Sequence, residues 1–215
     1  MTEKEQFTAG VSLLAGALLS TLAMSLHPAG GNLREIAHMK QAMLFSHSIA
    51  LCCIPMLAFG YRGLSRLLSK GSPWTGLGFS FIQFGLAGVL IAGTINGLVL
   101  PLFAISYQSF VIDEITAVAI IGYGSLFNHA LAYIFIAAMV IAMSIWSGII
   151  VRTNLLPRWL GIFGLGIVAA ILIATGSQFH FTAVWAFRLL TFLLASWQLT
   201  VALLLMRMSP KNKLT

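Results

Sequence analysis

Long apolar runs separated by short polar segments make up most of this chain. Six runs are long enough to cross a membrane: residues 7–26, 39–61, 76–100, 122–151, 159–175 and 181–206. Each reaches or approaches the roughly 20 residues that span a hydrocarbon core about 30 Å thick. The pattern therefore predicts an all-α polytopic membrane protein, with six transmembrane helices in one domain, residues 1–215.

Prolines mark the expected ends and kinks of these helices. Pro28 follows the first run, where Gly30 and Gly31 allow a turn, and Pro55 predicts a kink in the second span. Pro101 is expected to end the third span. The long connection after it, residues 101–119, is expected to form a short helix on the outer surface or an extension of the fourth span.

The lysines and arginines predict the orientation. With the N-terminus placed inside, nine of them fall on one side of the membrane: Lys4, Arg62, Arg66, Lys70, Arg152, Arg158, Arg207, Lys211 and Lys213. The other side receives Arg34 and Lys40, and Arg188 lies within the last span. Because cytoplasmic loops are enriched in Lys and Arg, both termini are expected in the cytoplasm.

Composition narrows the class of protein further. The chain is 59% hydrophobic and 8% charged, with a mean hydropathy of +0.97, which excludes an ordinary soluble domain. The net charge of +7 comes from basic residues scattered over short loops rather than from one basic face, so no nucleic acid partner is expected.

Several strongly polar residues lie inside the predicted spans. Counting about 1.5 Å per residue from the cytoplasmic end of each span places His47 about 22 Å deep and His129 about 34 Å deep, with Asn96 and Asn128 near His129. These groups fall in the outer half, whereas the inner half reads as Leu, Ile, Val, Phe and Met. The asymmetry predicts a polar cavity facing outward, closed beneath by an apolar plug.

Arg188 is the most unusual residue of the spans, because an arginine there costs about 2.5–3.5 kcal/mol even on insertion scales. One interpretation is an anion clamp that binds a lipid headgroup or a carboxylate ligand, or that pairs with Asp113 or Glu114. The alternative is a structural arginine that forms an ion pair or reaches the outer interface.

The other intramembrane polar residues also have two interpretations. A histidine in lipid is often a ligand or a proton carrier, so His47 is either a site residue or a neutral imidazole bonded to a neighbouring helix. Asn96, Asn128 and His129 are either site residues or hydrogen-bond partners between helices.

No metal or other cofactor is expected. His38 and His47 are nine residues apart, which puts them on opposite faces of a regular helix, so a metal site would have to combine His27, His38 or His180 with His47 or His129. A haem held by two histidines is not expected either, because His47 and His129 differ by about 12 Å on the depth count.

Four segments resemble a known group of proteins. They are His27-Pro28, the YRGLSRL segment at residues 61–67, the Asn96-Gly97…Pro101 end of the third span, and the R-x-x-x-LPRWLG turn at residues 152–161. Together they resemble small bacterial six-helix membrane proteins classified as domains of unknown function. The resemblance implies a bacterial inner-membrane protein with six helices, and it carries over no activity and no functional residue.

These observations favour a binding or accessory protein whose outward-facing pocket holds a small molecule or a lipid headgroup. The residues expected to form this pocket are Arg188, His47, Asn96, His129 and Asn128, with Asp113 or Glu114 as a counter-charge. One alternative is an intramembrane enzyme acting on an outer-leaflet lipid, with His47 or His129 as acid/base. Another is a structural subunit of a larger membrane complex. Membrane lipids are the expected partners, together with a small-molecule ligand, a second protein or another copy of the chain.

Overall fold

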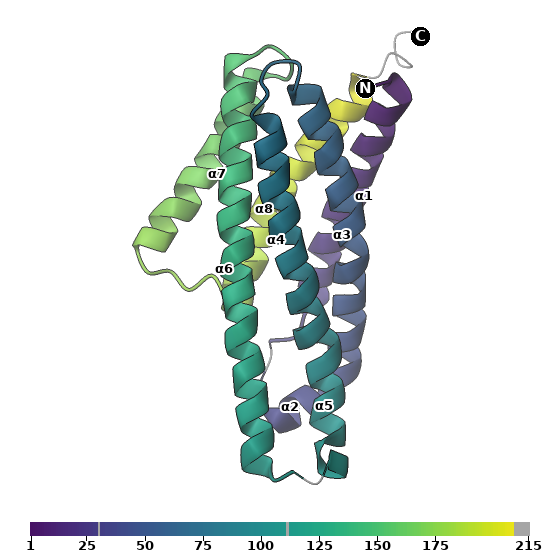
Figure 1. Ribbon diagram of the computed structural model, residues 1–215, viewed down its shortest axis with the longest axis vertical. Coiled ribbons are helices and arrows are strands. Elements are labelled where there is room, and N and C mark those ends of the chain that lie inside the picture. The colour runs from purple at the N-terminus through teal and green to yellow at the C-terminus, as the bar shows by residue number, and fades with distance from the viewer. Residues whose placement is uncertain (30, 111, 209–215) are drawn as a thin grey trace.

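The computed structural model describes residues 1–29, 31–110 and 112–208, and the described chain is all-helical (Figure 1). Gly30, Lys211 and Lys213 of the sequence predictions lie outside these residues. The described helices long and apolar enough to cross a membrane number six, as predicted: α1 (Glu3–Leu26), α3 (Lys40–Leu68), the continuous rod Thr75–Ser106, α6 (Glu114–Arg152), α7 (Arg158–Gly176) and α8 (Val184–Arg207).

The rod Thr75–Ser106 has three parts, which are α4 (Thr75–Thr94), the π-helix η1 (Ile95–Val99) and α5 (Leu100–Ser106). Pro101 does not end this helix, contrary to expectation. It lies in the first turn of α5, where a missing N–H is tolerated, and the preceding π-turn lets the Leu100 N–H bond to the Ile95 carbonyl five residues back. The helix therefore continues past the proline to Ser106.

Short elements close the end at which α5 finishes. The 3-10 helix η2 (Tyr107–Phe110) follows α5, and α2 (Leu33–His38) packs beside α5 and α6 (Figure 1). The Asn32 side chain begins α2 by accepting hydrogen bonds from two of its free backbone N–H groups. A small apolar cluster unites this end: Leu33, Ile36, Met43, Ala104 and Ala117.

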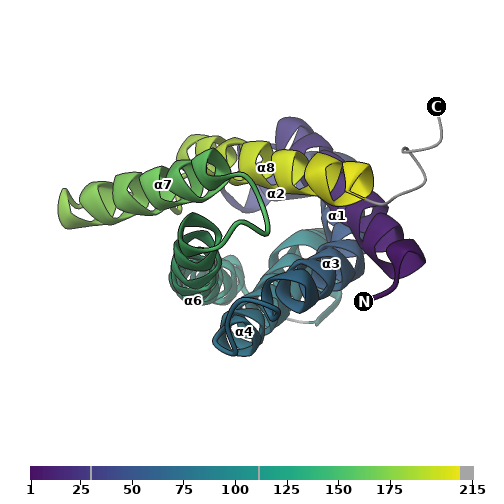
Figure 2. The ribbon, with the colours of Figure 1, turned by 90° about the horizontal axis from the view of Figure 1, so that it is seen from above.

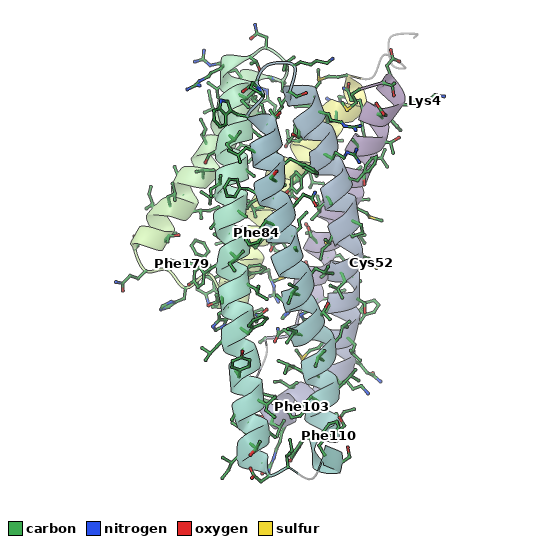
Figure 3. The ribbon with its side chains drawn as sticks, in the orientation of Figure 1. Lys4, Cys52, Phe84, Phe103, Phe110 and Phe179 are labelled. Atoms are coloured by element: carbon green, nitrogen blue, oxygen red, sulfur yellow. The ribbon has the colours of Figure 1, made fainter. Side chains whose placement is uncertain are left out.

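The start of α1 and the end of α8 lie at the same end of the bundle, where the Gln6 side chain donates to the Leu205 carbonyl at 3.1 Å. The α3–α4 and α6–α7 connections lie there too (Figure 1). We call this the basic end, since its described basic residues are Lys4, Arg62, Arg66, Lys70, Arg152, Arg158 and Arg207. Figure 3 shows Lys4 at this end, and Phe103 and Phe110 at the opposite one.

The helices form two layers when the bundle is seen along its length: α7, α8 and α1 lie on one side, and α6, α4 and α3 on the other (Figure 2). Glycines allow the closest approaches. A Cβ on Gly60 of α3 would lie 2.6 Å from the Leu13 Cβ of α1, and one on Gly10 of α1 would lie 2.9 Å from the Ala202 carbonyl of α8. Small residues permit such contacts where lipid removes the hydrophobic drive for helix association.

The half of the bundle nearer the basic end is not purely apolar, so that expectation was wrong. Gln198 of α8 is buried there, and its side-chain amide donates to the Tyr61 hydroxyl at 2.7 Å. The buried Trp146 and Trp197 indoles donate to backbone carbonyls of neighbouring segments. An uncharged amide with a partner is tolerated at this depth, whereas an unpaired charge is not.

Candidate binding cavity

A cavity of about 160 Å³ lies between the end of α1, α3, the α4–η1 rod, α6 and the start of α8. An apolar cavity of similar size, about 150 Å³, holds one benzene molecule. The polar side chains that line it are His27, His47, Asn96, Asn128 and Thr182, and the larger apolar ones are Met24, Leu51, Ile54, Val89, Leu131 and Phe187. The structure thus brings His47, Asn96 and Asn128 of the predicted site together.

These three residues lie at nearly the same depth. His47 is 21 residues from the end of α3 at Leu68, Asn96 is 21 residues from the start of the rod, and Asn128 is 24 residues from the end of α6. These separations correspond to about 31–36 Å of helix. The depth expected for His47 was too small because α3 continues about two turns past Tyr61 instead of ending there. The expected 12 Å offset between His47 and His129 disappears for the same reason.

The cavity is polar at one end and apolar at the other. His47 precedes Ile54 by seven residues on α3, and Asn96 follows Val89 by seven on the antiparallel rod. Seven residues of helix span about 10 Å. Both pairs therefore place their polar member farther from the basic end and their apolar member nearer to it.

Two histidines meet at the polar end. The His27 and His47 ring centroids are 4.7 Å apart, with ring planes inclined by 55°. The His47 Nδ1 lies 2.9 Å from the Met43 carbonyl oxygen, and the His27 Nδ1 lies 2.6 Å from the Pro28 carbonyl oxygen. A carbonyl oxygen only accepts, so each Nδ1 carries the proton and each Nε2 of a neutral ring keeps its lone pair.

Neither Nε2 has a hydrogen-bond partner among the described residues. Burial lowers the pKa of His27 below its ordinary 6.5, and the positive charge of Arg188 lowers it further, against the opposing effect of the Pro28 carbonyl. His27 is therefore neutral at pH 7. His47 is 6% exposed and has no acidic neighbour among the residues that line the cavity, so an unpaired charge there would be unfavourable.

The π-helix brings two residues to this site. Gly97 packs directly against the His47 imidazole, and a Cβ at this position would collide with the ring. Asn96 precedes it and lines the cavity. Single π-turns occur frequently at functional sites, because the extra residue changes where the neighbouring side chains point.

Arg188 lies beside the cavity without lining it. Its Nε donates to the Met24 carbonyl and its Nη2 to the His27 carbonyl, both at 2.9 Å. The last carbonyls of a helix have no partner within it, and a basic side chain can satisfy them. Arg188 is therefore a cap for the end of α1 that fixes His27, and no described carboxylate pairs with it.

The remaining predicted residues lie away from the cavity. His129 is half-buried but turned by about 100° around α6 from Asn128, so it does not line the cavity. Asp113 caps α6 by accepting from the Thr116 N–H at 2.7 Å, which lowers the pKa of this exposed carboxyl. Glu114 is exposed in the first turn of α6, about 21 Å of helix from Asn128, and supplies no counter-charge to the cavity.

The histidines do not assemble a metal site of the usual kind. His38 on α2 and His180 in the α7–α8 connection are both exposed and lie apart from the His27–His47 pair. Within the described ranges no three His, Cys, Asp or Glu residues are grouped closely enough to hold a metal ion.

Two polar lining residues, His27 and Thr182, were not predicted as members of the site. His27 was assigned to the outer loop, and the sequence signal that points to it is its place at the end of a span, directly before a proline. Thr182 comes from the α7–α8 connection and carries no comparable signal. Neither neighbour could be assigned to His47 without knowing how α1 and α8 pack against α3.

The fold defines a multi-pass α-helical membrane protein with a cavity lined by two histidines and two asparagines. No family model, curated protein or solved structure is significantly similar to this chain.

Proposed function

We propose that this protein binds a small molecule or the headgroup of a lipid in the His27–His47 cavity, as a binding or accessory protein of the bacterial inner membrane. The observation that carries the proposal is that His27, His47, Asn96 and Asn128, from four different segments, line one cavity. Polar side chains at membrane depth are unfavourable without partners, and those kept there commonly serve a ligand. Neither asparagine side chain has a hydrogen-bond partner among the described residues.

The proposed orientation places the basic end in the cytoplasm. The distribution of lysine and arginine supports it, because such residues concentrate on the cytoplasmic side. The polar end of the cavity, about 31–36 Å of helix from the basic end, is then near the boundary between the hydrocarbon core and the outer headgroups.

Native mass spectrometry of protein extracted with its native lipids tests this function. We expect a bound species on the wild-type protein that is depleted in His47→Phe, which keeps a flat ring against Gly97 but removes both ring nitrogens. His129→Phe makes the same chemical change outside the cavity and should retain the species. Equal retention in all three proteins, or no bound species in any, would contradict the proposal.

One observation favours an enzyme as the second candidate. A neutral imidazole in the lining of a cavity, with its Nε2 unoccupied, can accept a proton from a bound hydroxyl, as a general base does. His47 is then the residue that acts on an outer-leaflet lipid, while His129, the other predicted acid/base, lies outside the cavity. A His47→Phe variant that still binds the lipid but no longer converts it to product would favour the enzyme over the binding protein.

A further inference from the structure

The polar end of the cavity lacks charged groups. None of the described residues that line it is an Asp, Glu, Lys or Arg. It offers two imidazole Nε2 acceptors, the side-chain amides of Asn96 and Asn128, and the Thr182 hydroxyl. His47 is more than nine-tenths buried, so its unoccupied acceptor is satisfied only by something inside the cavity.

The two unpaired Nε2 atoms restrict which ligands fit this end of the cavity. Each Nε2 needs a donor, and an ester carbonyl, an ether or a phosphodiester has none. An anion gains little here, because the Nε and one terminal nitrogen of Arg188 already donate to the Met24 and His27 carbonyls. A metal cation would have only two imidazoles as strong ligands, with a guanidinium close by and no carboxylate in the lining.

The apolar end determines the rest of the ligand. Ile54, Val89 and Phe187 line it, and Phe187 packs against Phe135 of α6 with ring centroids 6.4 Å apart. About 160 Å³ accommodates a compact group of roughly benzene size, or a hydroxyl-bearing glycerol unit with the first methylenes of its chains. The line from the polar to the apolar end of the cavity runs along the helices. A bound ligand therefore has its polar group farther from the basic end of the bundle than its apolar part.

We propose that the cavity binds an uncharged amphiphile whose free hydroxyl donates its one proton to the His47 Nε2 and accepts from the Asn96 side-chain amide, with its apolar part between Ile54, Val89 and Phe187. This inference rests on the proposed binding function and names its ligand class. Two sources offer this chemistry: a membrane lipid with a free glycerol hydroxyl, such as a diacylglycerol, and a free alcohol or phenol of small size.

Binding of four probes to the full chain in lipid nanodiscs tests the proposal. The probes are dioctanoylglycerol, its methyl ether in which the hydroxyl is blocked, dioctanoyl phosphatidic acid, and 4-propylphenol. We expect dioctanoylglycerol or the phenol to bind, and blocking the hydroxyl to weaken binding about 3- to 10-fold, which corresponds to the loss of about one hydrogen bond. Tight binding of the glyceride alone indicates a lipid, and of the phenol alone a free small molecule.

The variants connect this preference to the histidines. His47→Phe and Asn96→Leu should each weaken binding of the hydroxyl probe about 3- to 10-fold and bring its affinity close to that of the methyl ether, whereas His129→Phe should leave both affinities unchanged. Unchanged gel-filtration and thermal unfolding profiles identify the variants that remain folded. Because the two variants lie on different helices, the test can still be read if one of them does not fold.

Three outcomes overturn the inference. They are tighter binding of phosphatidic acid than of the hydroxyl probe, equal binding of the hydroxyl probe and its methyl ether, and no binding of either hydroxyl probe. If native lipid extraction nevertheless finds a species that His47→Phe loses, the binding function stands and only the ligand class is wrong. If that species is also absent, the binding function itself fails.

Discussion

The His47 imidazole is held by backbone groups rather than by another charge. Its Nδ1–H donates to the Met43 carbonyl, and its ring rests against Gly97 of the π-helix. A histidine within an apolar run is conspicuous in a sequence, which is why His47 could be predicted as a site residue. Its contact with Gly97 could not be predicted, because it depends on a π-turn, and no local sequence pattern predicts that turn. Arg188 was equally conspicuous, but its partners are two backbone carbonyls that carry no sequence signature.

Gly97→Ala is expected to displace the His47 ring. The new methyl group occupies the position of the imidazole, and overpacking of this kind costs about 1–3 kcal/mol in the free energy of unfolding. Ligand binding should weaken as well, because the Nε2 atom moves. Thermal unfolding and ligand binding in detergent or nanodiscs measure the two effects.

Gly88→Ala is the matched control for this change. It lies in α4 of the same rod, and its added methyl group meets only ordinary contacts, the nearest being the Leu131 carbonyl oxygen at 3.6 Å. It should leave binding unchanged, and leave stability unchanged or raise it by up to about 1 kcal/mol through helix propensity. If Gly97→Ala behaves like Gly88→Ala, the described packing of His47 on the π-helix is incorrect.

His27 makes stability depend on pH in a defined direction. Its pKa in the folded protein is below the 6.5 expected for the unfolded chain, because burial and Arg188 disfavour the charged form. As the pH falls from about 6.5 toward that lower pKa, the unfolded state takes up a proton that the folded state does not, so the free energy of unfolding decreases. Denaturant unfolding at pH 7.5 and 5.5 measures this loss. It should be smaller in His27→Phe, and an equal loss in both proteins would argue against a buried, neutral His27.

At the scale of helices, the existence of each span could be predicted and its ends could not. Hydropathy identifies an apolar run, but α3 continues through the polar YRGLSRL segment to Leu68, since packing against its neighbours buries Tyr61, Leu64 and Leu68 there. Pro101 gave a false end for the rod because the π-turn before it removes the conflict. The depth of His47, which was counted from the expected end of α3, was therefore too small. For this reason the sequence did not show that His47, Asn96 and Asn128 lie at nearly the same depth.

The close packing of α1 on α3 predicts a large effect of a small substitution. A methyl group at Gly60 would lie 2.6 Å from the Leu13 Cβ and 2.8 Å from its Cα, which is backbone and cannot move aside. We expect Gly60→Ala to lower the free energy of unfolding by about 1–3 kcal/mol. Gly122→Ala in α6 meets nothing within 4 Å and should be neutral or raise stability by up to about 1 kcal/mol through helix propensity. Similar losses in both variants would contradict the α1–α3 contact.

The helices of the molecule differ in length, and the longest of them exceed the thickness of a bilayer core. The 39 residues of α6 extend about 58 Å, nearly twice the 30 Å hydrocarbon thickness, whereas the 19 residues of α7 extend about 28 Å. With one end of α6 at the basic end, its other end projects beyond the core together with α2 and α5 (Figure 1). The asymmetry of polar residues in the sequence predicted a cavity at this side. It overlooked Gln198, which stands within the last predicted span nine residues before Arg207 and lies buried beside Tyr61 in the other half.

Cysteine labelling tests the orientation of the molecule. In a variant with Cys52 and Cys53 replaced by alanine, Asn154→Cys and Ser177→Cys each place one thiol in an exposed connection, one before α7 and one after it (Figure 1). A membrane-impermeant maleimide should label Ser177→Cys in intact cells and Asn154→Cys only after lysis, because the basic end is proposed to be cytoplasmic. The reverse pattern would show that the cavity opens toward the cytoplasm.

The central claim is that His27, His47, Asn96 and Asn128 enclose one site that holds a ligand. An experimental structure of the protein extracted with its native lipids measures this most directly. We expect density in the cavity within hydrogen-bond distance of the His47 Nε2 and the Asn96 side chain, continuing toward Ile54 and Phe187. A cavity filled by the protein's own side chains, or His47 facing lipid on the outside of the bundle, would contradict it.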